Sequence, residues 1–164
     1  MSIEFNAAEI FEMAEQIERN GAAFYRAAAG QFPQASVLLN TLAEQEDEHL
    51  AIFTGMLREL GARETEPVIF DPDNDAALYL KAMADRRVFK IDQDPGSMLG
   101  DNPSLEHVLG IATGMEKESI VFYTGMKALV SPAQGQDRLD AIILEEWKHI
   151  TFLSKLSDDL SHPA

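Results

Sequence analysis

Residues 139–156 read Leu-Asp-Ala-Ile-Ile-Leu-Glu-Glu-Trp-Lys-His-Ile-Thr-Phe-Leu-Ser-Lys-Leu, a segment with apolar residues at helical spacing. The apolar face also carries Glu146 and His149. An ionised carboxylate buried without a partner is strongly unfavourable, so Glu146 needs a cation or strong hydrogen-bond donors nearby. Residues three apart on a helix point to the same side, so Glu146 and His149 together make half of a metal site.

The same Glu-x-x-His pattern occurs in a second predicted helix. Glu46 and His49 lie on one helical face, between Leu42 on one side and Phe53 and Met56 on the other. Either pair alone is also compatible with a solvated acidic face. The argument for a site therefore needs further residues.

Two other predicted helices each carry one glutamate on the apolar face, Glu18 beside Ile17 and Glu116 beside Met115. Each glutamate is followed seven residues later by a tyrosine, Tyr25 or Tyr123. Glu116 comes 98 residues after Glu18, and the second Glu-x-x-His comes 100 residues after the first. The chain therefore reads as two helical hairpins of matching design.

The predicted architecture is all-α: one domain, residues 1–164, with four long helices at about 6–29, 34–60, 103–130 and 135–160. Asn6 and Asn102 are the expected N-caps of the first and third helices. The connection 62–101 is too long for a tight turn and is expected to contain a short helix at 75–88. We expect it to run from one end of a bundle to the other, the alternative being a surface insertion.

Composition excludes several classes of protein. The net charge is -15, and the sequence has no basic stretch that could neutralise phosphates, which argues against a nucleic-acid partner. No apolar run is long enough to span a membrane, and Met1-Ser-Ile-Glu-Phe lacks the features of a signal peptide, so we expect a cytoplasmic protein. The sequence contains no cysteine, which excludes disulfides and thiolate metal sites within it.

Four helices with one inward glutamate from each of two helices and one Glu-x-x-His from each of the other two match the pattern of a dimetal carboxylate bundle. The motifs Ile-Glu-x-x-Gly-x-x-Phe-Tyr, Leu-Ala-Glu-Gln-Glu-x-Glu-His, Met-Glu-x-x-x-x-x-Phe-Tyr and Glu-Glu-x-x-His-Ile resemble the rubrerythrin-like branch of the ferritin-like superfamily. The resemblance covers all four helices but not the connection. It implies a ferritin-like four-helix bundle with one long crossover.

The resemblance also implies a cofactor and its ligands. The cofactor would be two iron ions, with manganese or zinc as alternatives. Glu46 and Glu116 are the candidates for carboxylates that bridge the two ions. The implied metal ligands are Glu18, Glu46, His49, Glu116, Glu146 and His149.

Two features depart from the family's pattern. Ser119 stands where rubrerythrins proper often have another ligand glutamate, and a rubredoxin-like domain is expected to be missing. Asp71, Asp73 or Asp75 could in principle supply a replacement ligand.

The function implied is that of a non-haem di-iron oxidoreductase acting on peroxide or oxygen. The alternatives are a ferroxidase linked to iron storage and a non-catalytic metal-binding or purely structural bundle. We expect a homodimer that depends on an external electron-donor protein, because the sequence has no four-cysteine iron site of its own.

The remaining polar and aromatic side chains receive simpler interpretations. Tyr25 and Tyr123 either pack in the core or hydrogen-bond to ligand carboxylates contributed by the opposite hairpin. Trp147 is expected to face away from the ligands. The side chains expected to be solvated or on the surface are Glu44, Glu48, Glu118, Glu145, His107 and His162. Glu145 adjoins Glu146, so the alternative is that Glu145 takes the role assigned to Glu146.

Overall fold

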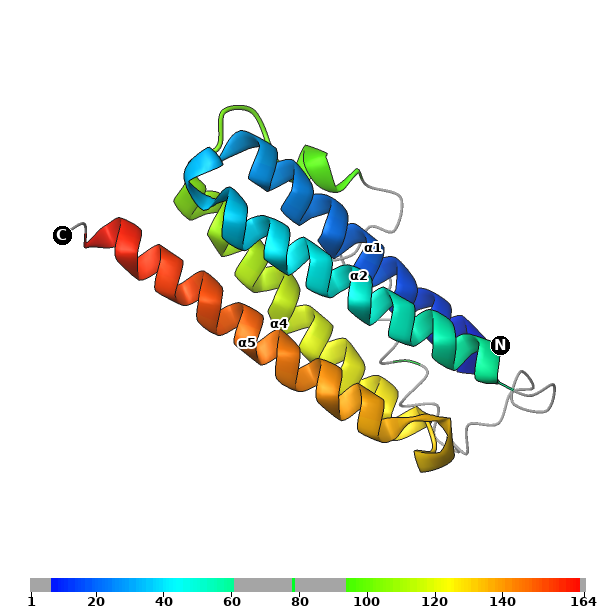
Figure 1. Cartoon of the computed structure of the whole chain (residues 1–164). Helices are drawn as coiled ribbons and strands as arrows, with labels where there is room; N and C mark the ends of the chain where they lie inside the picture. The colour runs from blue at the N-terminus through cyan, green and yellow to red at the C-terminus, as the bar shows by residue number, and fades with distance from the viewer. Residues whose placement is uncertain (1–6, 61–77, 79–93, 163–164) are drawn as a thin grey trace.

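The computed structural model describes residues 7–60, 78 and 94–162. These residues form a bundle of long α-helices, and no β-strand occurs among them. The helices lie side by side as two hairpins (Figure 1). Their bounds are α1 (Ala7–Gln31), α2 (Ser36–Glu59), α4 (Leu105–Leu129) and α5 (Gln136–Ser161).

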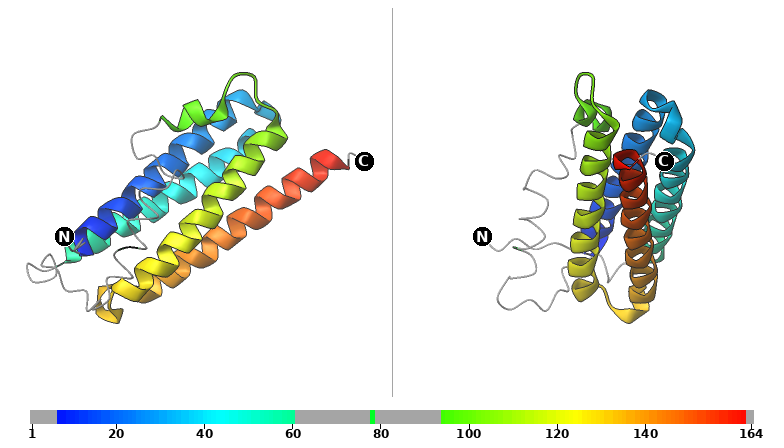
Figure 2. Two further views of the ribbon diagram at one scale, coloured as in Figure 1. Left: turned by 180° about the vertical axis from the view of Figure 1, so that it is seen from behind. Right: turned by 90° about the vertical axis from the view of Figure 1, so that its left-hand side faces the viewer.

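Each hairpin is closed by a short 3-10 turn that contains a proline. The turn Pro33–Ala35 joins α1 to α2, and Pro132–Gln134 joins α4 to α5. Gly135 follows the second turn with a φ of 107°, a left-handed conformation that glycine adopts without strain. Tight turns make the helices of each pair antiparallel neighbours (Figure 2).

The connection between the hairpins does cross the length of the bundle. Buried apolar residues form two clusters, one toward each end of the bundle. Met56, near the end of α2, belongs to the same cluster as Ile10. Leu105, at the start of α4, belongs to the other cluster together with Leu39. The chain must therefore travel from one end of the bundle to the other. The predicted helix at 75–88 and the three aspartates of the connection lie outside the described residues.

The start of α4 corrects one predicted cap. Asn102 has a φ of 58°, so its backbone is left-handed and not the extended form of an N-cap. Ser104 caps the helix instead, with an extended backbone and a hydroxyl that accepts a hydrogen bond from the His107 amide at 3.1 Å. The other predicted cap, Asn6, lies outside the described residues.

The buried apolar residues form two clusters, one toward each end of the bundle. Phe24, Leu42 and Met115 belong to the first cluster, which also takes in Leu99 from the 3-10 helix Pro95–Leu99. Ile17 and Phe122 belong to the second. In each of the four long helices, the predicted metal ligands lie between a residue of the first cluster and a residue of the second. The fold therefore places the ligands in a polar layer between two apolar layers.

A separate property concerns membranes. Among the described residues, no helix is both long and apolar enough to cross a bilayer.

Candidate metal centre

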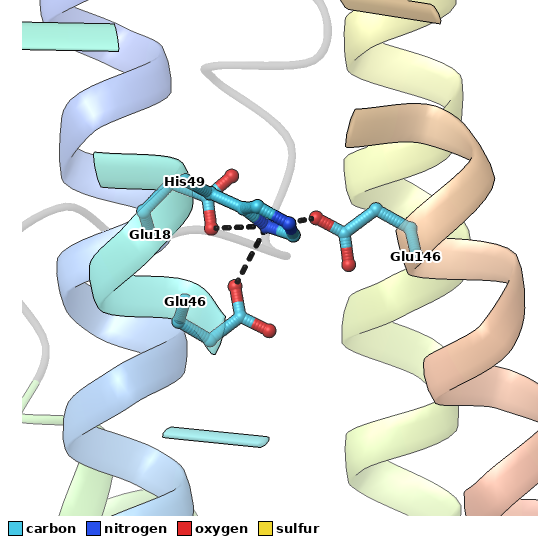
Figure 3. A group of neighbouring side chains, drawn as sticks. All are labelled: Glu18, Glu46, His49 and Glu146. Carbon is cyan, nitrogen blue, oxygen red and sulfur yellow. Dashed lines mark ion pairs between the residues drawn. The ribbon is translucent and has the colours of Figure 1, made fainter. Parts of the chain in front are cut away.

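All six predicted ligands are buried and converge on the middle of the bundle. Glu18, His49, Glu146 and His149 have no exposed surface, while Glu46 and Glu116 are 4% and 3% exposed. Figure 3 shows Glu18, Glu46 and His49 facing Glu146 across the space between the hairpins. Each helix contributes to the cluster because its polar positions interrupt an otherwise apolar inner face.

The first group of ligands surrounds the imidazole of His49. Its Nδ1 lies 3.1 Å from Glu146 Oε1, 3.6 Å from Glu18 Oε2 and 3.9 Å from Glu46 Oε2. One ligand atom from each of these four residues lies within 4.8 Å of the others. Figure 3 marks the three approaches to His49.

A second group of the same design surrounds His149. Its Nδ1 lies 3.0 Å from Glu146 Oε2, 3.2 Å from Glu46 Oε1 and 3.4 Å from Glu116 Oε1. The two imidazole rings are 5.7 Å apart and nearly parallel.

The two groups share two carboxylates. Glu46 and Glu146 each belong to both groups, with one oxygen directed toward each histidine, whereas Glu116 belongs only to the group of His149. Of the two candidate bridges, Glu46 lies between the histidines, whereas Glu116 contacts His149 alone, and its bridging role stays a prediction. Glu46 and Glu146 occupy matching positions in α2 and α5, so the repeat places both between the histidines.

The six glutamate and histidine side chains are suited to bind metal cations. Six atoms on the inner side of the cluster are buried with no hydrogen-bond partner among the described residues, although buried polar atoms are normally satisfied. These atoms are Glu18 Oε2, Glu46 Oε1, both carboxylate oxygens of Glu146, and Nδ1 of each histidine. Oxygen and imidazole donors that converge without partners are what non-haem iron, manganese or zinc require.

The metal-free cluster holds protons in place of cations. Burial alone would lower the pKa of His49, but the Glu146 and Glu18 carboxylates raise it to about 11. Burial likewise opposes the charge on His149, while Glu116 and Glu146 raise its pKa to about 9. The two imidazolium groups therefore compensate part of the buried negative charge when no metal is bound.

The carboxylates divide into protonated and ionised groups for the same reason. Burial and the charge of Glu146 raise the pKa of Glu46 well above its usual range and that of Glu116 to about 8. Burial also acts on Glu146, but the two histidines outweigh it and lower the pKa of Glu146 well below its usual range. The two histidines therefore favour the ionised form of Glu146 in the metal-free cluster.

Both tyrosines contact carboxylates of the opposite hairpin, as predicted. Tyr25 on α1 donates a hydrogen bond to Glu116 on α4, and Tyr123 on α4 donates one to Glu18 on α1. Burial and the neighbouring carboxylates raise the pKa of both phenols well above 10, so both remain donors.

Two residues contact the site although the sequence did not predict them there. Glu145 was expected to be solvated, but its Oε2 accepts a hydrogen bond at 2.8 Å from Nε2 of His49. Its position next to Glu146 in a helix was the available signal. Gly21, the glycine of the Ile-Glu-x-x-Gly motif, is the second residue, because a Cβ there would meet the Glu46 carboxylate carbon at 3.3 Å.

Most of the side chains expected on the surface are exposed. Glu44, Glu48, His107 and His162 are exposed, as predicted, and Trp147 is 57% exposed on the side away from the ligands. Glu118 is half-buried instead of fully solvated.

The sequence model of the Rubrerythrin family matches residues 9–157, which is most of the chain. The chain belongs to the rubrerythrin family. A solved structure from Thermotoga maritima, assigned as a ferritin-like diiron-carboxylate protein, matches with a TM-score of 0.74 and 24% identity, covering 97% of this chain and 99% of that one. At that identity the likeness supports the ferritin-like fold alone. No curated protein matches the sequence.

Proposed function

We propose that this member of the rubrerythrin family is a non-haem di-iron oxidoreductase that acts on peroxide or oxygen. The observation that carries the proposal is the pair of overlapping ligand groups with Glu46 and Glu146 in common. Two shared carboxylates would hold two ions close together. Four ionised glutamates would also balance the charge of two divalent cations, which explains how so many carboxylates can be buried at one place.

Two adjacent ferrous ions, when bound, supply one electron each to the reduction of an O–O bond. The chain's own contribution is to position the ligands and to shelter them. Glu18 and Glu116 would each serve one ion, held in place by Tyr123 and Tyr25. The apolar clusters on either side of the polar layer limit the access of water.

The experiment is anaerobic titration of the purified chain with ferrous iron, followed by addition of peroxide or oxygen. We expect about two irons per chain and oxidation detected by the absorption of ferric iron. Glu46→Ala and Glu146→Ala should each reduce the stoichiometry and the oxidation rate. Glu48→Ala, an exposed glutamate on the same helix as Glu46, is the matched control and should change neither.

The outcomes separate the alternatives. No bound metal in the wild-type chain would favour a purely structural bundle. Metal binding without oxidation would favour a non-catalytic metal-binding protein. Oxidation with accumulation of many irons in a large shell, detected by light scattering, would favour ferroxidase action linked to storage. A homodimer in the cytoplasm is the state that we propose for the oxidoreductase.

A further inference from the structure

The two histidines at the centre differ in what supports them on the far side of the ring. Both direct Nδ1 toward the ligand cluster, so Nε2 is the atom left for a supporting contact. Nε2 of His49 has such a contact, the hydrogen bond of 2.8 Å to Glu145 Oε2. Nε2 of His149 is buried and has no hydrogen-bond partner in the part of the chain that the structure describes.

The internal repeat explains where the missing support would come from. Glu145 precedes Glu146 on α5 and reaches the histidine of α2. The matching residue, which precedes Glu46 on α2, is Gln45. Its Oε1 is also buried without a hydrogen-bond partner. The His49 half of the site therefore has a carboxylate contact that the His149 half lacks among the described residues, and the matching position carries a neutral amide.

A carboxylate behind a metal-binding histidine has two effects. It fixes the ring and its tautomer, with the proton on the far nitrogen, and it makes the near nitrogen a stronger electron-pair donor. An amide oxygen that accepted the same proton would be a weaker acceptor because it carries no net charge. The hydrogen bond to the far nitrogen of a histidine therefore alters the affinity of that histidine for a metal ion.

We propose that Glu145 is a positioning residue that makes the His49 half of the site the tighter of the two metal positions, so that the two positions fill in sequence. This inference rests on the proposed function, because it assumes that both groups bind a divalent cation. Glu145 acts through His49 and is not a ligand itself, since its Oε2 contacts the ring nitrogen on the side away from the cluster.

The test is calorimetric titration of the metal-free protein with Co²⁺ under anaerobic conditions. The wild-type chain should show two unequal binding steps. Glu145→Gln should weaken the tighter step by about 10- to 100-fold and leave the weaker one within about twofold. Gln45→Glu should strengthen the weaker step instead. Glu48→Gln, which removes an exposed charge next to His49 in sequence, is the control and should change neither.

A second readout follows the histidine protons directly. In Zn²⁺-loaded protein labelled with ¹⁵N, the Nε2 proton of His49 should be protected from exchange with water to a degree that Glu145→Gln removes. Because Glu145 lies half-buried at the edge of the cluster, its amide variant should retain the helical circular dichroism of the wild type.

The outcomes are distinguishable. Two binding steps that Glu145→Gln leaves unchanged would overturn the role of Glu145 while leaving the proposed function intact. Equal weakening of both steps would overturn the asymmetry. A wild-type chain that binds no Co²⁺, Zn²⁺ or Fe²⁺ would overturn both this inference and the proposed function.

Discussion

The hydroxyl group of Tyr25 on α1 donates a hydrogen bond to Oε1 of Glu116 on α4, so the first hairpin holds a ligand of the second. Tyr123 makes the reciprocal contact with Glu18. These two bonds join the hairpins at the level of the candidate metal centre, where both tyrosines are buried. Tyr123 binds Oε1 of Glu18 and leaves Oε2, the oxygen that faces His49, for a cation. Tyr25 binds Oε1 of Glu116, which is also the oxygen that faces His149.

Replacement of both tyrosines by phenylalanine should alter the metal centre and preserve the fold. Each substitution leaves a buried carboxylate oxygen without its donor, a loss of about 1–3 kcal/mol in the free energy of unfolding of the metal-free protein. Metal affinity or oxidation rate should also fall, because the ligand carboxylates are no longer held in place. Thermal denaturation and Fe²⁺ titration measure the two effects. Unchanged affinity and rate would reduce both tyrosines to packing residues.

The metal-free protein should lose stability as the pH rises above neutrality. Its folded-state pKa values are about 11 for His49 and 9 for His149, against 6.5 in the unfolded chain, and about 8 for Glu116 against 4.5. Above the unfolded values the folded protein therefore binds more protons than the unfolded chain, and the free energy of unfolding decreases with pH. The stabilising contribution of each histidine is complete below 6.5 and is lost as the pH passes its folded pKa.

Acid should also destabilise the metal-free protein, for the opposite reason. The pKa of Glu146 is lowered in the folded state, so its contribution is present above 4.5 and is lost as the pH falls toward the folded value. The melting temperature should thus be highest at about pH 5–6 and lower at about pH 9. Zinc-loaded protein should show the reverse change over the alkaline range, because binding displaces the protons. Equal melting temperatures for the metal-free protein at both pH values would contradict this picture of the cluster.

Gly21 should be required for the position of a shared carboxylate. An added Cβ would lie 3.3 Å from Cδ and Oε2 of Glu46, closer than such contacts normally are. Gly21→Ala should therefore displace the Glu46 carboxylate and weaken metal binding. The matched control is Gly55→Ala on α2, where a Cβ would meet nothing within 4 Å. It should stabilise the helix by up to about 1 kcal/mol without affecting metal binding. Equal metal affinity in the two variants would show that the Glu46 side chain can move aside freely.

The helices and the six central residues were predictable because one pattern specified both. Glutamate and histidine on an apolar helical face must point inward with the apolar residues around them. The offsets of 98 and 100 residues between matching positions indicated two hairpins of the same design. Helical spacing therefore fixed which side chains meet.

What the sequence could not provide was the reach of individual side chains across the bundle. The contact of Glu145 with His49 joins α5 to α2, and the position of Glu145 beside Glu146 indicates only that it lies near the site, not which residue it contacts. The sharing of Glu146 by both ligand groups was not predicted for a similar reason, since it depends on how the two hairpins face one another. The N-cap of α4 is Ser104 and not Asn102, because Asn102 has a left-handed backbone. Asparagine and serine are both good capping residues, so residue type alone does not predict which of them caps the helix.

The last prediction is that the chain cannot turn over without a separate electron donor. The sequence has no cysteine and hence no four-cysteine iron site to return electrons to the centre. Tyrosine and tryptophan side chains can relay charge but do not store electrons at low potential. We propose that a donor protein with local positive charge docks on this acidic chain, whose net charge is -15. Electron transfer should then slow as salt concentration rises.

Peroxide consumption in the absence of any reductant tests the need for a donor. The protein is loaded anaerobically with ferrous iron, excess peroxide is added, and the equivalents consumed are counted. About one peroxide per pair of ions is expected, followed by arrest, because two ferrous ions provide only the two electrons that one peroxide takes up. Glu146→Ala, which removes a shared carboxylate, should reduce the rapid phase. Sustained consumption by the wild-type chain would indicate catalase-type chemistry, in which peroxide serves as both oxidant and reductant and no donor is needed.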